Sequence, residues 1–225
     1  LILWDLNSGE SVRNLVGHAT AVEDVAYDPD GMRAVSASGD GTIIIWSLPE
    51  GEILQRFQTS GGDVRSVAFT PDGQRILSGS GDGTMQIWDS EAGLEINRIR
   101  AHYDIEAGED AIESAAESNA IEAVDISDDG LMAVSGSRDR TIRLWNIGTA
   151  GLAAELSEEN ARSRVTGVAF GTSDDQILYG DVEGFLRSWD IRTREQNTIL
   201  QLSDSPIRTL DVNSEGNRIL LGERD

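Results

Sequence analysis

Five tryptophans recur at a nearly constant spacing, and this repeat constrains the fold more than any other feature of the chain. Each ends a short apolar run, and successive tryptophans are 42, 42, 57 and 44 residues apart, at Trp4, Trp46, Trp88, Trp145 and Trp189. The text before them also recurs, as SGDGTIIIWS at residues 38–47, SGDGTMQIWD at 80–89 and SRDRTIRLWN at 137–146. A segment that returns at a fixed interval is one structural unit used several times.

The sequence of each unit predicts four short antiparallel strands. Residues 22–38 are two β-rich runs joined by Asp28-Pro29-Asp30-Gly31, where proline fixes φ and glycine accepts a left-handed backbone, so a hairpin is predicted. Asp40-Gly41 then favours a two-residue type I′ turn into a third strand, TIIIWSL. A fourth strand follows in EILQRFQ, the counterpart of SVRNLVGH. A four-stranded unit of 40 to 45 residues is typical of one blade of a β-propeller.

We therefore predict an all-β chain that forms a single β-propeller domain over residues 1–225. Its sequence is long enough for five blades of four antiparallel strands each. The repeat units are about 1–42, 43–84, 85–141, 142–185 and 186–225. The third unit carries an acidic, alanine-rich insertion at 103–119 whose composition favours helix. Two roles for the insertion stay open, a lid or partner-specific contact and a solvated loop.

The repeat resembles the WD-repeat β-propeller family, whose marks are a Gly-His before the first strand and a Trp-Asp after the third. Gly17-His18 carries the first mark, and Trp4-Asp5, Trp88-Asp89 and Trp189-Asp190 carry the second. The resemblance covers the whole chain except the insertion. Two arrangements stay open: residues 1–6 close a ring by pairing with the strand that ends at Asp225, or the five units belong to a longer propeller. Seven blades are commonest in that family, which favours the longer propeller.

The resemblance also implies a hydrogen-bonded tetrad of histidine, serine, aspartate and tryptophan that braces each blade. Two sets of residues match it, namely His18, Ser36, Asp40 and Trp46, and His102, Ser135, Asp139 and Trp145. Other blades depart from the pattern, with Ser60 at the histidine position of the second and Tyr179 and Glu183 in the fourth. Those blades are expected to be less rigidly braced.

Charge and composition exclude several classes of function. The chain has 40 acidic and 18 basic residues, a net charge of −22, and every basic residue is arginine. Phosphate-rich partners need a basic surface, so neither nucleic acid nor an anionic membrane is an expected partner. No apolar run approaches the ~20 residues of a membrane-spanning helix. We expect a soluble protein, with the cytoplasm favoured, although nothing in the sequence assigns its location.

Catalytic and metal-binding motifs are missing. Without lysine there is no Walker phosphate loop, and without cysteine and with only two histidines there is no credible zinc cluster. His18, Ser36 and Asp40 are the residue types of a catalytic triad, but the serine and aspartate recur in blades that lack histidine, as bracing groups would. We predict that the chain is not an enzyme and that it binds no cofactor and no metal. The alternative is the propeller domain of an enzyme or of a signalling ATPase or kinase, with catalysis outside these residues.

The predicted function is that of a protein-interaction scaffold or sensor. The resemblance implies that a peptide or protein partner binds at the mouth of the channel, through three positions in each blade near the first strand and the tight turn. Eight of these fifteen positions are charged, and they are the predicted partner-binding residues: Glu23, Asp63, Arg65, Glu122, Arg138, Arg164, Arg208 and Arg224. Thr166 occupies one of the uncharged positions.

Two interpretations of these charges stay open. Guanidinium groups form bidentate pairs with carboxylates and phosphates, so the arginines are expected to bind an acidic or phosphorylated peptide. Alternatively, the arginines pair with Glu23, Asp63 and Glu122 across the mouth of the channel.

Overall fold

The fold is built entirely of β-strands in the part of the chain that the structure describes. The computed structural model describes residues 1–102, 119–156, 163–171, 173, 175–202, 204–213 and 218–223. Two strands form the first sheet, β1 (Ile2–Trp4) and β2 (Ser11–Asn14). Four complete sheets follow: β3 (Val22–Tyr27), β4 (Arg33–Ser38), β5 (Thr42–Ser47), β6 (Ile53–Gln58); β7 (Val64–Phe69), β8 (Arg75–Ser80), β9 (Thr84–Asp89), β10 (Glu95–Arg100); β11 (Ile121–Ile126), β12 (Met132–Ser137), β13 (Ile142–Asn146), β14 (Gly151–Leu156); β15 (Val165–Phe170), β16 (Gln176–Asp181), β17 (Phe185–Asp190), β18 (Glu195–Gln201). The last two-stranded sheet pairs β19 (Ile207–Val212) with β20 (Ile219–Glu223).

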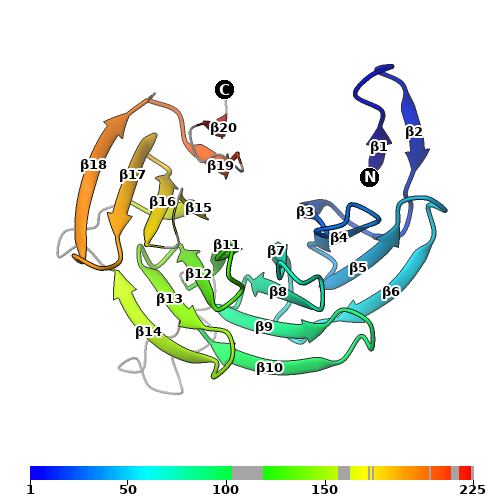
Figure 1. The fold of residues 1–225 in the computed structure, drawn as a ribbon, viewed down its shortest axis with the longest axis horizontal. Helices are drawn as coiled ribbons and strands as arrows, with labels where there is room; N and C mark the ends of the chain where they lie inside the picture. The colour runs from blue at the N-terminus through cyan, green and yellow to red at the C-terminus, as the bar shows by residue number, and fades with distance from the viewer. Residues whose placement is uncertain are drawn as a thin grey trace.

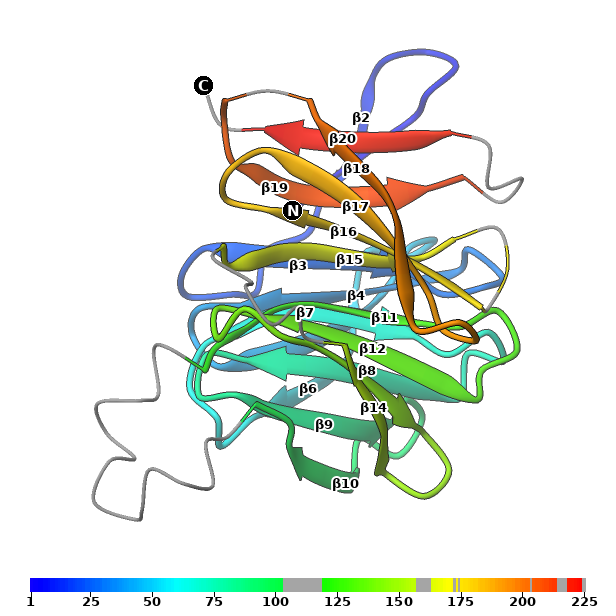
Figure 2. The same cartoon turned by 90° about the vertical axis from the view of Figure 1, so that its left-hand side faces the viewer.

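The sheets are arranged radially around a common axis, as the blades of a propeller are (Figure 1). In each complete blade the four strands are antiparallel neighbours in chain order. The first strands, β3, β7, β11, β15 and β19, line the inside, and β6, β10, β14 and β18 form the outer rim (Figure 1). Figure 2 shows the sheets from the side, one above another, with β19 and β20 at the top and β9 and β10 at the bottom. The predicted blade of four antiparallel strands is confirmed.

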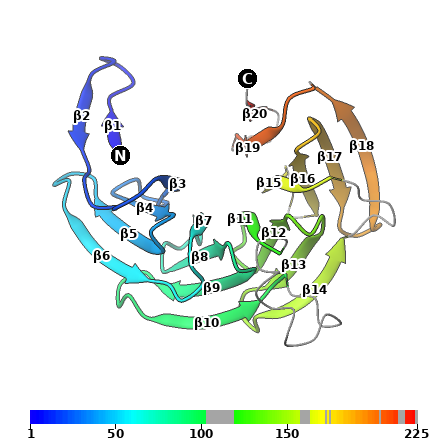
Figure 3. The ribbon, with the colours of Figure 1, turned by 180° about the vertical axis from the view of Figure 1, so that it is seen from behind.

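The blades form an open arc. The two-stranded sheets β1–β2 and β19–β20 stand at its two ends with a gap between them, as the views from both faces show (Figures 1 and 3). Among the described residues β1 pairs only with β2, and β20 only with β19. In this structure residues 1–6 therefore do not close a ring. Each complete blade takes its strands from two successive repeat units, since the first unit supplies β1 to β4.

The turns explain why these segments form hairpins. Gly31, Gly73 and Gly130 each have a φ near +70°, which glycine adopts without a steric penalty, and each turn is closed by a backbone hydrogen bond such as Gly31 N to Asp28 O at 3.0 Å. The predicted type I′ turn at Asp40-Gly41 is wrong. Gly41 has φ +77° but Asp40 is not left-handed, and Gly41 N donates to Ser38 O. Such a three-residue loop, a type I turn followed by a left-handed residue, also joins strands without splaying them.

Apolar clusters fill the spaces between neighbouring blades. Between the first two complete blades, Phe57 stacks on Trp88 with ring centroids 5.5 Å apart, and both belong to a buried cluster with residues of β4, β5 and β7. Similar clusters lie between the later blades. Each blade is therefore stabilised by burying its faces against both neighbours, which holds the inner strands in register around the axis.

Most of the insertion, residues 103–118, lies outside the described residues, and so does its predicted helix. Asn119 is described and buried, and Ser137 Oγ donates to its carbonyl at 3.1 Å. Within the described ranges, no helix has the length and apolar character needed to cross a membrane.

Candidate functional site

The first blade contains a relay of hydrogen bonds that starts at its tryptophan. Trp46 Nε1 donates to Ser36 Oγ at 2.8 Å, and Ser36 Oγ lies 2.7 Å from His18 Nε2. Because Ser36 accepts from Trp46, its own proton is available to His18 Nε2, which leaves the imidazole proton on Nδ1. Nδ1 lies 2.9 Å from Thr42 Oγ1, and Thr42 Oγ1 donates to Asp40 Oδ1 at 2.6 Å. The predicted four residues lie together, with Thr42 inserted between His18 and Asp40.

The third blade repeats this relay with a more direct last step. Trp145 Nε1 donates to Ser135 Oγ at 2.9 Å, Ser135 Oγ lies 2.7 Å from His102 Nε2, and His102 Nδ1 lies 2.9 Å from Asp139 Oδ2. Burial lowers the pKa of His102 despite the neighbouring carboxylate, so the imidazole is neutral at pH 7. His102 is fully buried and both of its ring nitrogens have hydrogen-bond partners, which is the arrangement expected of a group that braces the blade.

The other two complete blades hold their tryptophans differently. In the second, Trp88 Nε1 still donates to Ser78 Oγ at 3.0 Å, and Ser60 is exposed at the histidine position. In the fourth, Trp189 Nε1 is buried and has no hydrogen-bond partner among the described residues. An ion pair between Arg187 and the buried Asp181 takes the place of the relay there, and the Arg187 guanidinium lies 4.8 Å from the centre of the Phe185 ring.

Polar hydrogen bonds also tie the inner strands to one another. Asp24 Oδ2 on β3 accepts from Ser66 Oγ and Val67 N of β7, both at 2.9 Å, and Ser66 Oγ accepts from Val124 N of β11 at 3.1 Å. Farther along, Asp125 Oδ2 on β11 accepts from Phe170 N of β15 at 2.8 Å. These bonds fix the positions from which the charged side chains at the mouth project.

Asp125 has an unusual ionisation. Burial raises the pKa of its carboxyl to about 6, and repulsion from Asp211 and Asp128 adds to the effect. Burial also raises the pKa of Asp24. Both carboxyls join neighbouring blades, so their ionisation is coupled to how tightly the inner strands pack.

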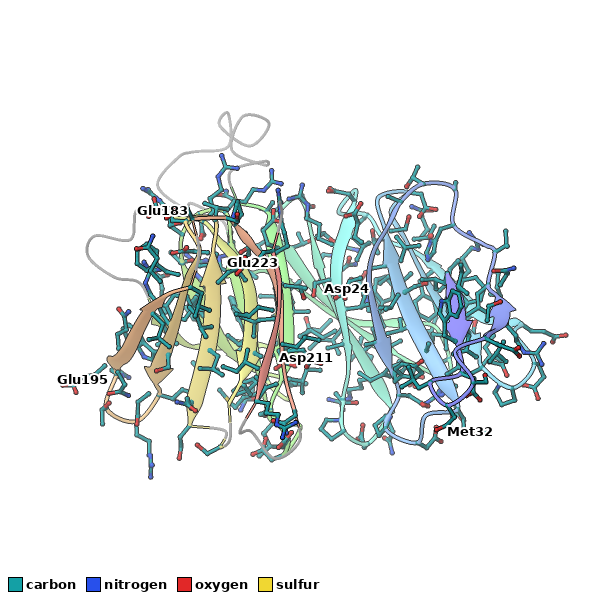
Figure 4. The ribbon with its side chains drawn as sticks, turned by 90° about the horizontal axis from the view of Figure 1, so that it is seen from above. Asp24, Met32, Glu183, Glu195, Asp211 and Glu223 are labelled. Carbon is teal, nitrogen blue, oxygen red and sulfur yellow. The ribbon has the colours of Figure 1, made fainter. Side chains whose placement is uncertain are left out.

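A cavity of about 380 Å³ lies among the inner strands at the end of the blades that carries the tight turns. We call it the mouth cavity, and it is lined by Glu23, Asp63, Arg65, Glu122, Arg138, Thr166 and Arg208. Figure 4 marks the two faces of the molecule: Glu183, in the tight turn between β16 and β17, lies on the upper side, and Glu195 and Met32 lie on the lower side.

The structure brings six of the eight predicted partner-binding residues together in the mouth cavity. Thr166, one of the uncharged positions, completes the lining. Arg164 is exposed just before β15 and is not part of the lining, and Arg224 lies outside the described residues. With three carboxylates and three arginines, the cavity is balanced in formal charge.

Some of these charges neutralise one another. Arg65 Nε donates to Asp63 Oδ2 at 2.8 Å, and Arg65 also pairs with Glu122. Arg138 pairs with the same Glu122 oxygen. The pairs raise the pKa of Arg65 against the opposing effect of its burial. Within the described residues, however, Glu23, Arg164 and Arg208 have no ion-pair partner.

Thr166 is buried, and its hydroxyl group already makes hydrogen bonds within the protein. Its hydroxyl oxygen lies 3.2 Å from the carbonyl of Gly180 and also donates to Ile207 O across to β19. The described residues contain no group of three or more histidine, cysteine, aspartate or glutamate side chains placed to hold a metal ion. The charged side chains that line the mouth cavity can form ion pairs with a charged ligand.

The radial four-stranded blades, with a charged cavity at one end of the inner strands, define a β-propeller. The model of the family described as WD domain, G-beta repeat matches residues 9–47, 51–89 and 113–146. The chain is therefore a member of the WD-repeat family. None of the curated proteins matches it. Domains built from WD repeats generally mediate protein–protein interaction or scaffolding, and they are typically not catalytic.

Proposed function

We propose that this chain is a non-catalytic interaction module that binds an acidic or phosphorylated peptide of a protein partner at the mouth cavity. The observation that carries this proposal is the unequal pairing of the arginines. Arg65 and Arg138 are occupied by Glu122 and Asp63, whereas Arg208 projects into the same cavity without an ion-pair partner among the described residues. Arg164, in the neighbouring blade, is exposed and also has no ion-pair partner in the part of the chain that the structure describes.

Physical chemistry favours an anionic ligand for these two arginines. A guanidinium presents its donors in a planar fork that matches a carboxylate or phosphate, and such charge-assisted bonds are stronger than neutral ones. The rest of the molecule has a large excess of negative charge and repels anions elsewhere. The same excess disfavours nucleic acid and anionic membranes as partners.

A peptide selection tests the proposal. The chain is offered a library that spans acidic, phosphorylated, basic and apolar sequences, and the selected peptides are titrated again at raised salt. We expect acidic or phosphorylated peptides to be enriched and their affinity to fall with salt, because partly exposed charges are screened. Enrichment of basic or apolar peptides would contradict the proposal and would favour internal pairing as the role of the arginines.

A second candidate function rests on the family alone. The chain would then be the propeller domain of an enzyme or of a signalling ATPase or kinase, with the chemistry outside these residues. The mouth cavity would have the same role of binding a peptide in that case.

A further inference from the structure

The charges around the mouth cavity are unevenly distributed. Asp63, Arg65, Glu122 and Arg138 form one continuous chain of three ion pairs that joins the second and third complete blades, and their formal charges cancel. Two charged residues of the lining stand outside this chain, Glu23 and Arg208. The net electrostatic character of the cavity therefore depends on where these two residues lie.

Glu23 and Arg208 lie at opposite ends of the row of inner strands. Glu23 is on β3 and Arg208 is on β19, the first and the last inner strands along the arc (Figure 1). Both side chains are exposed, and neither has an ion-pair partner within the described residues. One end of the cavity thus carries an unbalanced negative charge and the other an unbalanced positive charge.

Local packing shows why Glu23 is available and Asp63 is not. A Cβ atom built on Gly81 would lie 2.0 Å from Asp63 Oδ1, so the Asp63 carboxylate is packed against that glycine and paired with Arg65. At the equivalent Gly39 a Cβ atom would lie 3.5 Å from Glu23 Oε1, an ordinary contact. Because Glu23 is exposed and has no ion-pair partner among the described residues, it can receive a group from solvent.

We infer that the mouth cavity binds a dipolar peptide segment, with a cationic side chain at Glu23 and a carboxylate or phosphate at Arg208. This inference rests on the proposed function and extends it from an anion to a charge pair. A purely anionic peptide gains an attraction at Arg208 but is repelled by Glu23 and by the acidic body of the protein. A dipolar peptide is attracted at both ends and adds no net charge, so charge complementarity favours it and fixes its direction across the cavity.

Three synthetic end-capped peptides of equal length test the inference. One carries three glutamates, one carries three arginines, and the third carries arginines in one half and glutamates in the other. Their binding to the whole chain is followed by fluorescence anisotropy. We expect the dipolar peptide to bind most tightly.

Charge-neutralising variants show which end of the cavity binds each charged half of the dipolar peptide. Glu23→Gln should lower the affinity for the dipolar peptide by about fivefold, which is the scale of a partly exposed ion pair. The affinity for the glutamate peptide should stay unchanged or rise. Glu195→Gln is the matched control, because Glu195 is exposed on the opposite face (Figure 4) and the change in net charge is the same. It should leave both affinities unchanged.

The outcomes separate this inference from the proposed function. Glu23→Gln could have no more effect than Glu195→Gln while Arg208→Gln lowers the affinity for the glutamate peptide. In that case the inference of a dipolar ligand is wrong, and the proposed anion site at Arg208 is supported. If the glutamate peptide binds the unaltered chain at least as tightly as the dipolar peptide does, the inference is also wrong. If Arg208→Gln weakens neither peptide, the proposed function fails together with the inference.

Discussion

The hydrogen-bond relays of the first and third blades depend on a buried imidazole that both accepts and donates. In the first blade, removing it takes a hydrogen-bond partner from the hydroxyls of Ser36 and Thr42, and a stranded buried polar group costs about 1 to 3 kcal/mol. We therefore expect His18→Ala to lower the free energy of unfolding by that amount. Chemical denaturation of the variant measures it.

Ser60 supplies the matched control for His18. It stands at the equivalent position of the second blade, where it is exposed, and Trp88 is held by Ser78 without it. Ser60→Ala should leave the free energy of unfolding within experimental error. Equal losses for the two substitutions would contradict the bracing role of His18.

Asp125 gives a prediction about pH. Its folded-state pKa, about 6, lies above the ordinary value of 3.8, so its contribution to stability is complete below about pH 4 and is lost as the pH rises through 6. In Asp125→Asn this loss is absent. We expect the stability of the native chain relative to the variant to fall by about 2 kcal/mol between pH 4 and 7, as one pKa unit corresponds to about 1.4 kcal/mol. Denaturation of both proteins at several pH values measures it, and a constant difference would show that Asp125 has an ordinary pKa.

Sequence reasoning could place the histidine, serine, aspartate and tryptophan of the relay, because their spacing repeats. It missed Thr42, although the same threonine recurs as Thr84 and Thr141 after the tight turn and donates to the turn aspartate in all three blades. It also missed the Asp181–Arg187 pair of the fourth blade. Among the residues that the structure describes, that pair has no counterpart in the other repeats, so no periodic signal marked it.

At the level of strands and turns, the tight turn after the second strand of each blade positions the charged side chains. The structure predicts that Gly81→Ala displaces Asp63 and breaks its pair with Arg65, because the new Cβ atom would overlap the Asp63 carboxylate. We expect a loss of about 1 kcal/mol, since Asp63 is partly exposed and can move toward solvent. Thermal unfolding measures the loss, and Gly39→Ala, where the new atom makes only ordinary contacts, is the control. Similar stabilities for the two variants would contradict this packing.

The insertion is expected to be separable from the blades. Replacing residues 103–118 by a two-residue link should keep the all-β circular dichroism and change the melting temperature only slightly, because the other blades are joined without it. Asn119 is retained because its carbonyl accepts from Ser137. Loss of the folded state on replacement would show that the segment is part of the core.

The hairpins were predictable from their Pro, Asp and Gly residues, whereas the type of the tight turn was not. Asp-Gly is compatible with two loop geometries. In one, both Asp40 and Gly41 are left-handed, and in the other only Gly41 is left-handed. The structure has the longer loop, in which Asp40 keeps an ordinary backbone and accepts from Thr42 N at 2.9 Å. Side-chain hydrogen bonding thus decides a choice that the dipeptide leaves open.

For the molecule as a whole, the repeat fixed the radial architecture and the positions that converge at its mouth. Six of the eight charged positions lie in one cavity because each blade presents the same repeat positions at the same end of its inner strand. Which charges pair with one another was not predictable, because Arg65 reaches Glu122 in the next blade, 57 positions along the chain. Such contacts depend on the packing of neighbouring blades and not on the pattern within one repeat.

The affinity of one acidic peptide for two charge-reversal variants tests the central claim most directly. Arg208→Glu alters the unpaired arginine of the mouth cavity, and Arg75→Glu alters an exposed arginine at the opposite end of its blade that is likewise unpaired among the described residues. By isothermal titration we expect Arg208→Glu to weaken binding by about tenfold or more, which corresponds to ~1.5 kcal/mol, the lower end for a hydrogen bond to a charged group. Arg75→Glu should leave the affinity unchanged. Equal effects of the two reversals would contradict a partner site at the mouth cavity.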